Sequence, residues 1–334
     1  ARFALGGGTP PFLDLDDLRL VFDWLRLTDI PMSVEASPAT IDEEKLAFLR
    51  ERGVTRLSMG VQSFLEEETS SVARKQNPEV LETALQLLRG CRIPTINLDL
   101  IYGLPGQTEK TWRYSLQRVL EEAPVEIYLY PLYVRDLTGL GKREREWPDS
   151  RLRFYRTGRD FLLEQGYEQV SMRMFRRIDC QNDEGPIYCC QTDGMLGLGC
   201  GARSYTQSLH YSNEYAVGAS GIREILTSYL SRSNEAFQMA SYGYELDDED
   251  QRRRFVIQSL LQVEGLSFPQ YQERFGTSAL RDLPQLSELL DRRLALESSE
   301  RLCLTETGLE LSDAIGPWLY SARARRLMEE YELQ

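Results

Sequence analysis

The chain has 334 residues, enough for one large domain with a sizeable core and a smaller module. Its 52 acidic and 39 basic residues give a formal net charge of −13, and this balance argues against nucleic acid as a partner. No apolar run reaches the roughly 18 residues of a membrane span, so we expect no membrane insertion. The six cysteines of so long a chain do not form a disulfide framework, and we expect a cytoplasmic protein.

Short β-rich runs alternate with helical patterns in the first half of the chain, which is typical of parallel strands joined by crossover helices. The strands are predicted at 2–5, 32–35, 56–61, 96–102, 126–132 and 169–174. Three helices have visible start signals. They are a capping box at 40–43, Asn77 before Pro78, and Thr108 before the helix that runs towards Glu121.

Polar or glycine-rich motifs end the first four predicted strands. Three glycines follow the first strand, Glu35 ends the second, Gln62 ends the third and Asp99 lies within the fourth. Loops and helix N-termini converge at the carboxyl ends of parallel strands, so ligands bind there. Glycines at such an end let the backbone approach a ligand closely. The sequence therefore predicts a ligand site along one rim of a parallel sheet.

These motifs together resemble the core of radical S-adenosylmethionine (SAM) enzymes. Within them, the chain is similar to the oxygen-independent coproporphyrinogen III oxidase-like family, which also includes haem chaperones and certain methyltransferases. The resemblance covers nearly all of the first half and recurs weakly in the second half. The motifs that carry it are GGGTP at 6–10, SVEASP at 33–38, RLSMGVQSF at 56–64, NLDLIYGLPGQT at 97–108 and DGMLGLGCGARSY at 193–205.

The resemblance implies roles for eight residues. In the family, positions matching Gly7, Gly8 and Thr9 hold the methionine moiety of SAM, and the position of Glu35 accepts hydrogen bonds from it. Positions matching Gln62, Arg74 and Asp99 contribute to a second SAM site in the coproporphyrinogen oxidases. Tyr133 would border the adenosyl group and the substrate mouth. Two alternatives stay open, a surface cation for Arg74 and core packing for Tyr133. The resemblance assigns no catalytic residue.

The family uses a four-iron, four-sulfur cluster held by a CxxxCxxC loop after the first barrel strand. This sequence has no such motif, and we interpret Cys189, Cys190 and Cys200 as structural thiols rather than metal ligands. The chain begins abruptly at Ala1, immediately before the first predicted strand, so we expect the cluster ligands upstream of Ala1 and an inactive chain without them. The alternative is a family member that has lost the cluster and kept the ligand pocket.

We predict an α/β fold, a partial (βα)6 TIM-like barrel that lacks its first unit, followed by a helical winged-helix-like domain. The barrel would occupy residues 1–175, a connecting α+β segment 176–245 and the C-terminal domain 246–334. In that domain a helix is predicted at 279–292. A two-stranded wing with a Ser-Ser-Glu turn is predicted at 294–304.

For the full-length protein, the resemblance implies a radical SAM oxidoreductase. Such an enzyme cleaves SAM reductively to a 5′-deoxyadenosyl radical, which abstracts hydrogen from an organic substrate. In relatives the outcome is oxidative decarboxylation in porphyrin biosynthesis, so a tetrapyrrole is one candidate small-molecule substrate. A reductase or flavodoxin-type protein would donate the electron. The alternatives are a methyltransferase that uses two SAM molecules and a haem chaperone without catalysis.

Overall fold

A computed structural model describes residues 2–25, 30–72, 76–134, 149–180, 194–212, 219–240 and 242–330. The chain divides into two compact units, Ala1–Pro186 and Ile187–Gln334, and each has its own buried apolar cluster. The predicted boundaries at 175 and 245 stay a prediction. No helix in the described ranges is both long enough and apolar enough to cross a membrane.

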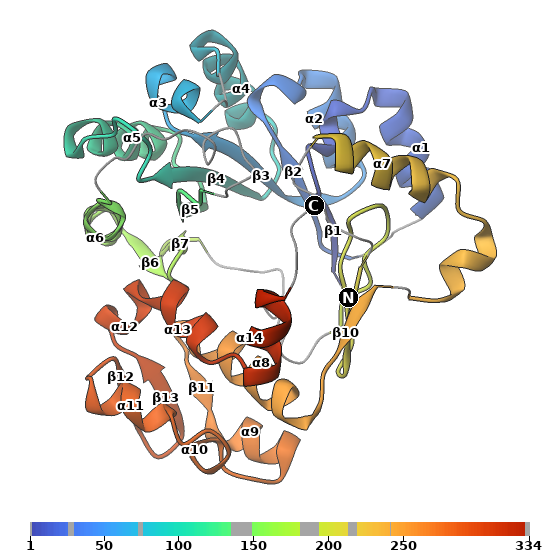
Figure 1. Cartoon of the computed structure of the whole chain (residues 1–334). Coiled ribbons are helices and arrows are strands. Elements are labelled where there is room, and N and C mark those ends of the chain that lie inside the picture. Colours follow the sequence, from blue (N-terminus) through green and yellow to red (C-terminus); the bar gives the residue numbers. More distant parts are fainter. Residues whose placement is uncertain are drawn as a thin grey trace. The chain divides into compact units, whose positions relative to one another are not determined.

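The first unit is built on a seven-stranded sheet with the order β1-β2-β3-β4-β5-β7-β6 (Figure 1). Strands β1 to β5 are parallel neighbours in chain order, which confirms the predicted α/β class. The six-unit barrel with a missing first unit stays a prediction. The strands are β1 (Phe3–Leu5), β2 (Met32–Ala36), β3 (Val54–Gln62), β4 (Thr95–Tyr102) and β5 (Glu126–Pro131). The helices are α1 (Leu15–Leu25), α2 (Glu43–Glu51), α3 (Glu66–Ser71), α4 (Pro78–Gly90), α5 (Glu109–Glu121) and α6 (Arg151–Glu164), with short 3-10 turns η1 (Pro10–Phe12) and η2 (Pro38–Thr40).

The prediction of one strand at 169–174 was wrong. This region forms a hairpin of β6 (Tyr167–Gln169) and β7 (Met174–Arg177), and β7 pairs antiparallel with β5. The connection between the two strands spans only 170–173. Such a short connection joins antiparallel strands, whereas a parallel crossover needs about a dozen residues or more.

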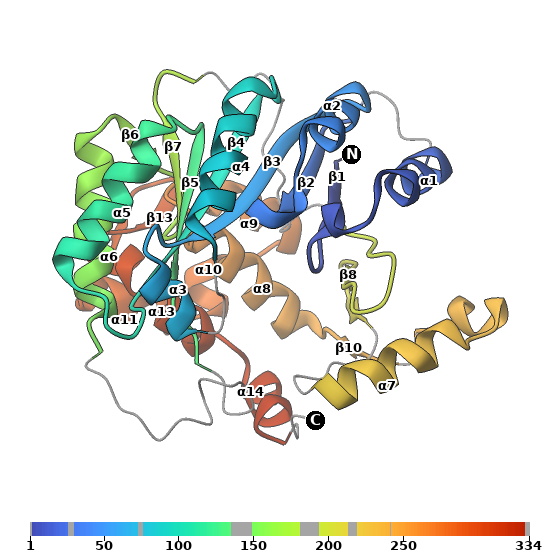
Figure 2. The same ribbon diagram turned by 90° about the horizontal axis from the view of Figure 1, so that it is seen from above.

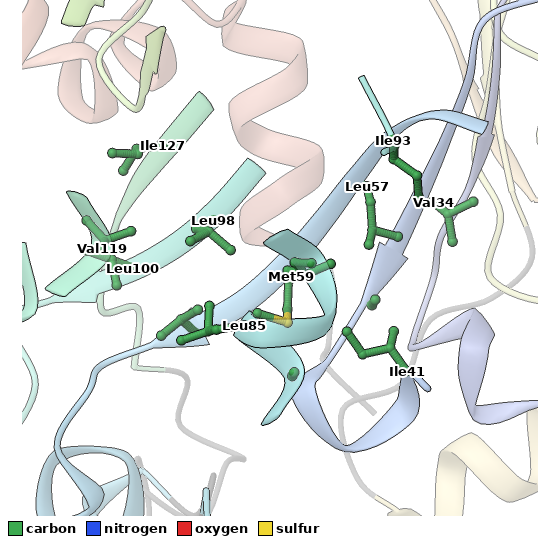
Figure 3. Packing of buried hydrophobic residues seen from close by; sticks show 14 of the residues in the cluster. Val34, Ile41, Leu57, Met59, Leu85, Ile93, Leu98, Leu100, Val119 and Ile127 are labelled. Carbon is green, nitrogen blue, oxygen red and sulfur yellow. The ribbon is translucent and has the colours of Figure 1, made fainter. Parts of the chain in front are cut away.

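Alternation along the strands divides the sheet into an apolar face and a polar face. In β4, Leu98 and Leu100 are fully buried on the face that packs against the crossover helices. Figure 3 shows them beside Leu85 of α4 and Val119 of α5, and Figure 2 shows helices along this outer side of the strands. Each such fully buried side chain contributes about 2 kcal/mol to stability. The opposite face, which we call the inner face, is left to polar side chains.

Two of the three predicted helix starts are confirmed. Asn77 caps α4 by accepting from the Glu79 amide, and Thr108 caps α5 by accepting from the Thr111 amide. The capping box predicted at 40–43 was wrong. Thr40 instead closes a box with Ser37 around η2, and Asp42 caps α2. The α-helix starts later because Asp42, whose side chain accepts from the Lys45 amide at 2.8 Å, is its N-cap.

The second unit carries two three-stranded sheets and the C-terminal helices. The predicted wing is confirmed as the β12–β13 pair joined by residues 298–300. The helix predicted at 279–292 is instead two helices, because Pro284 lacks an amide donor and disfavours helical geometry at Leu283. The strands are β8 (Ser204–Tyr205), β9 (Leu209–Tyr211), β10 (Gly243–Glu245), β11 (Leu266–Ser267), β12 (Ala295–Glu297) and β13 (Arg301–Leu304). The helices are α7 (Ala219–Leu230), η3 (Asn234–Gln238), α8 (Asp248–Leu260), α9 (Phe268–Phe275), α10 (Ala279–Asp282), α11 (Leu286–Asp291), α12 (Glu306–Glu310), α13 (Ser312–Trp318) and α14 (Ala322–Glu329).

Candidate functional site

Strand register lines up polar residues across the inner face of the sheet. Glu35 of β2 stands opposite Ser58 of β3, Ser58 opposite Asn97 of β4, and Asn97 opposite Glu126 of β5. Residues that stand opposite one another on neighbouring strands point to the same side of a sheet, so these four side chains lie on one face. Four neighbouring strands therefore contribute to one continuous polar surface.

A buried ion pair forms the base of this surface. The Glu126 carboxylate accepts from Arg56 Nε at 2.8 Å and from an Arg176 guanidinium nitrogen at 3.2 Å. Arg56 also donates to Ser58 Oγ at 2.7 Å. Because the Glu126 side chain is only 7% exposed, its charge depends on these two arginines for compensation. The pair fixes Arg56 within the sheet rather than leaving it free to bind a ligand.

Asp99 lies on the same face of β4, two residues after Asn97, which stands opposite Glu126. Asn97 Nδ2 donates to Asp99 Oδ1 at 2.7 Å and to Ser58 Oγ at 2.9 Å. Burial raises the pKa of Asp99 to about 6, although the Asn97 hydrogen bond and the Arg56 charge oppose this rise and the Glu35 carboxylate adds to it. Asn97 is 1% exposed, and its Oδ1 has no partner within the described ranges. Two carboxylates and an unused carbonyl oxygen thus favour a cationic ligand that carries N–H donors.

The glycine motif forms an open corner at the end of β1. A Cβ added to Gly6 would lie 2.9 Å from the carboxyl carbon of Glu35, so these two residues are neighbours. Gly7 and Gly8 have φ of +83° and +124°, a conformation that favours glycine, and no atom lies within 4 Å of a Cβ built on either. The space beside these glycines can therefore receive part of a ligand that also reaches Glu35.

Gln62 ends β3 in a left-handed conformation with φ of +67°, which is uncommon for a residue with a side chain. The pairing of β3 with β4 shifts register between Gly60 and Gln62. The Gln62 carboxamide folds back over Gly60, where it occupies the place that a Cβ would take. Such backbone strain costs about 1–3 kcal/mol and concentrates at functional sites. The bulge therefore returns Gln62 to the inner face, near Asp99.

The structure brings most of the predicted site residues to this face. Gly7 and Gly8 lie at its corner, and Glu35, Gln62 and Asp99 lie on it. Their binding roles stay predictions.

The other three predicted site residues, Thr9, Tyr133 and Arg74, are not placed on the inner face by the described contacts. Thr9 precedes η1 and makes no side-chain capping bond there. Tyr133 lies beyond the end of β5, is 52% exposed and accepts a hydrogen bond from Arg173 at 2.6 Å. Arg74 lies outside the described residues.

Sequence reasoning missed two tyrosines on the inner face, Tyr128 and Tyr130. Their rings stack with centroids 5.8 Å apart, Arg56 lies 5.7 Å from the first ring and Arg173 lies 5.8 Å from the second. Burial is the main cause that raises the pKa of both phenols. The alternation in Glu126–Pro131 could have revealed them, because every second residue of that strand is polar or tyrosine. Ser58, Asn97 and Glu126 were also missed, because only the register between neighbouring strands brings them to the same face.

The inner face fits SAM, which is cationic and carries amino and hydroxyl donors, but it provides no cluster ligands. Within the described ranges no group of three or more His, Cys, Asp or Glu side chains is placed to hold a metal ion. Cys200 is half-buried, and Cys189 and Cys190 lie outside those ranges.

Comparison with known proteins identifies the family. Residues 1–119 match the model of the radical SAM superfamily, and residues 246–311 match the HemN C-terminal domain. The chain is 28% identical over 283 residues to the oxygen-independent coproporphyrinogen III oxidase of Paracoccus denitrificans, covering 78% of this chain and 60% of that protein. It is 29% identical over 205 residues to the heme chaperone HemW of Escherichia coli, covering 59% of this chain and 54% of HemW. The chain thus spans little more than half the length of these relatives.

A solved structure of Escherichia coli coproporphyrinogen III oxidase (HemN), described as a radical SAM enzyme, has the same fold. It superposes with a TM-score of 0.79 at 26% identity, over 95% of this chain and 77% of that one. Both matched family models and the shared fold agree with the sequence motifs and the polar rim of the parallel sheet. The chain belongs to the radical SAM superfamily, in the HemN-like family.

Proposed function

We propose that the inner face binds SAM and that the protein containing this chain is a radical SAM enzyme of the HemN-like family. The observation that carries this proposal is that the carboxylates of Glu35 on β2 and Asp99 on β4 lie on one face of the sheet, beside the open glycine corner. Asp99 is partly buried and Glu35 is exposed, and two carboxylates that share one face favour a cationic ligand between them. The sulfonium and ammonium groups of SAM supply such charge.

One SAM molecule would take the corner between Gly7, Gly8 and Glu35. There the glycines leave room for a backbone approach, and the carboxylate of Glu35 accepts from the ligand's donors. A second molecule would contact Gln62 and Asp99, with Arg74 as the partner for its carboxylate. Both assignments draw on the family resemblance for the orientation of the ligand and on the described geometry for the acceptors.

When bound, SAM and the reduced cluster of a radical SAM enzyme together supply a radical that abstracts hydrogen from a substrate. The role of this chain is to bind and orient SAM and to exclude water from it. The cluster ligands that such chemistry needs are not among the described residues. The activity is therefore proposed for a protein in which a CxxxCxxC segment accompanies this chain.

Two reactions on this scaffold differ in their products. Oxidation of an organic substrate is favoured by the relatives named coproporphyrinogen III oxidase, and a tetrapyrrole is one candidate substrate. Methyl transfer would use the second SAM molecule as the carbon donor. A flavodoxin-type protein or a reductase would supply the electron in either case.

A haem chaperone is the second candidate function, and similarity to HemW favours it. The full-length protein, supplied with iron, sulfide, SAM and a reductant, separates the three. Release of 5′-deoxyadenosine without S-adenosylhomocysteine supports oxidation, and release of both supports methyl transfer. Stoichiometric haem binding with neither product supports the chaperone. A protein that neither binds SAM nor forms either product contradicts the proposal.

A further inference from the structure

A buried hydrogen-bond network joins the carboxyl ends of β3 and β4, and it begins at Ser63, the residue after Gln62. It consists of four side chains that are 0–9% exposed and that come from the loop after β3, from α3, from the loop before α5 and from α5 itself. We call it the rim clamp. Its members are Ser63, Glu68, Gln107 and Ser115.

Glu68 is the centre of the rim clamp. Its Oε2 accepts from Ser63 Oγ at 2.7 Å and from Gln107 Nε2 at 3.1 Å. The Glu68 residue is 4% exposed, although the neighbouring Glu66 and Glu67 on the same helix are exposed. Burying a polar group is costly unless it is hydrogen-bonded, and Glu68 Oε1 has no partner within the described ranges, so the two bonds to Oε2 are the ones that hold this side chain. Its two neutral donors are residues of the loops that leave β3 and β4.

Gln107 extends the rim clamp to the loop that follows β4. Its Oε1 accepts from the Gly103 amide at 2.7 Å, while its Nε2 donates to Glu68 and, at 3.4 Å, to the carbonyl of Ile101. The amide group therefore spans the end of the strand that carries Asp99. Because its oxygen and its nitrogen each have a different partner, only one orientation of the amide satisfies both.

Ser63 and Ser115 hold the other side, next to Gln62. Ser63 Oγ accepts from the Leu65 amide at 3.1 Å, and Ser115 Oγ accepts from the Phe64 amide at 3.3 Å. The chain immediately after Gln62 is thus pinned at successive residues. A non-glycine residue keeps a left-handed conformation only where the surrounding structure holds it there. The hydrogen bonds to the Phe64 and Leu65 amides restrain the chain directly after Gln62 in this way.

We propose that Glu68 and Gln107 are positioning residues that hold Gln62 in its left-handed conformation and fix its distance from Asp99. The effect on ligand binding rests on the proposed function. Binding of the second SAM molecule, which contacts Gln62 and Asp99, requires an intact rim clamp, whereas binding of the first at the glycine corner does not.

A charge exchange within the clamp tests this inference. Gln107→Glu places a second carboxylate against Glu68 and removes its donor. Glu68→Gln can turn its amide oxygen towards both donors and keeps most of the network. The double variant E68Q/Q107E restores the bond between positions 68 and 107 with donor and acceptor reversed, since Gln at 68 donates to Glu at 107. Glu at 107 can still accept from the Gly103 amide, and only the 3.4 Å bond to the Ile101 carbonyl is lost. Gln117→Glu adds the same charge at an exposed position of α5 and is the matched control.

The first readout is amide hydrogen exchange of residues 63–65 in the ligand-free full chain. We expect Q107E to accelerate it by about tenfold or more, E68Q to have a small effect, and the double variant to recover most of the wild-type protection. Core amides of β4 serve as the internal reference. If Q107E does not fold, Ser63→Ala removes only the hydroxyl and should accelerate exchange at Leu65. A double variant as fast as Q107E, or no acceleration in Q107E or Ser63→Ala, overturns the inference.

The second readout is the number of SAM molecules bound per chain by equilibrium dialysis. We expect Q107E to lose the weaker equivalent while the other is retained, and E68Q/Q107E to recover it. An equal loss of both equivalents indicates general destabilisation and overturns the positioning role in binding. A wild-type chain that binds no SAM refutes the proposed function, and the exchange pattern then decides the role of the clamp separately.

Discussion

Gly60 of β3 stands opposite Asp99 of β4, and the side chain of Gln62 fills the space where Gly60 lacks a Cβ. This relationship explains a glycine in the middle of a buried parallel strand, where its conformational freedom is normally a cost. The glycine leaves room for the carboxamide of Gln62 on the inner face, beside the one carboxylate of β4.

Gly60→Ala should therefore impair the site more than the fold. The added methyl group displaces only the mobile end of the Gln62 side chain, so we expect the unfolding temperature to change by a few degrees, and the affinity for the second SAM molecule to fall about tenfold. Calorimetric titration and thermal unfolding measure the two effects. Gly90→Ala is the control, since nothing lies within 4 Å of a Cβ there. Unchanged SAM binding in Gly60→Ala would show that Gln62 does not take part.

SAM affinity should depend on pH through Asp99. Burial raises its pKa to about 6, so the carboxylate is largely protonated at pH 5 and charged at pH 7.5. Because the charged form attracts a cation, we expect the second SAM molecule to bind more tightly as pH rises through 6. Asp99→Asn should flatten this dependence and bind weakly throughout. Binding titrations at several pH values measure it, and a pH dependence that survives in Asp99→Asn would assign the titration to another group.

The same shift has a consequence for stability in the ligand-free chain. The pKa of Asp99 is higher in the folded state than its ordinary value of 3.8, so protonation favours folding. This contribution is fully present below about pH 4 and is lost as pH rises through about 6, by at most about 3 kcal/mol. Urea unfolding of wild type and Asp99→Asn between pH 4 and 7 isolates it. Equal slopes against pH in both proteins would contradict the shift.

Glu126→Gln should destabilise the first unit. The substitution leaves two arginine charges facing a neutral amide in a buried position, and loss of one partner from such a network costs about 3 kcal/mol. Glu288→Gln breaks an exposed helical pair with Arg292 and should cost less than about 0.5 kcal/mol. Denaturant unfolding compares them, and similar losses for both would mean that the Glu126 pair contributes little.

Much of the first unit follows from local sequence signals. The alternation of short apolar runs with amphipathic segments predicts six strands, of which the first five form the parallel strands β1 to β5. Asn77 and Thr108 mark helix starts because a capping side chain acts within its own turn. The hairpin of β6 and β7 was missed, because residues 170–173 carry no strong turn signal and the pairing with β5 depends on tertiary contacts.

The candidate site was predictable only in part. Glu35, Gln62 and Asp99 end or interrupt apolar strands and draw attention in a sequence. Asn97 and Glu126 do not, since each becomes informative only when the register between neighbouring strands is known. The left-handed backbone at Gln62 is also invisible in the sequence, because it results from a register shift between two strands and from side chains more distant in the chain.

The most direct test of the central claim compares the affinity of the chain for SAM with that for S-adenosylhomocysteine, which lacks the sulfonium charge, in wild type and in Glu35→Gln/Asp99→Asn. We predict that the wild type prefers SAM, and that the double variant loses most of this preference while Glu44→Gln, on the exposed surface of α2, retains it. A double variant that discriminates as well as the wild type would contradict the claim that these two carboxylates form a cation site for SAM.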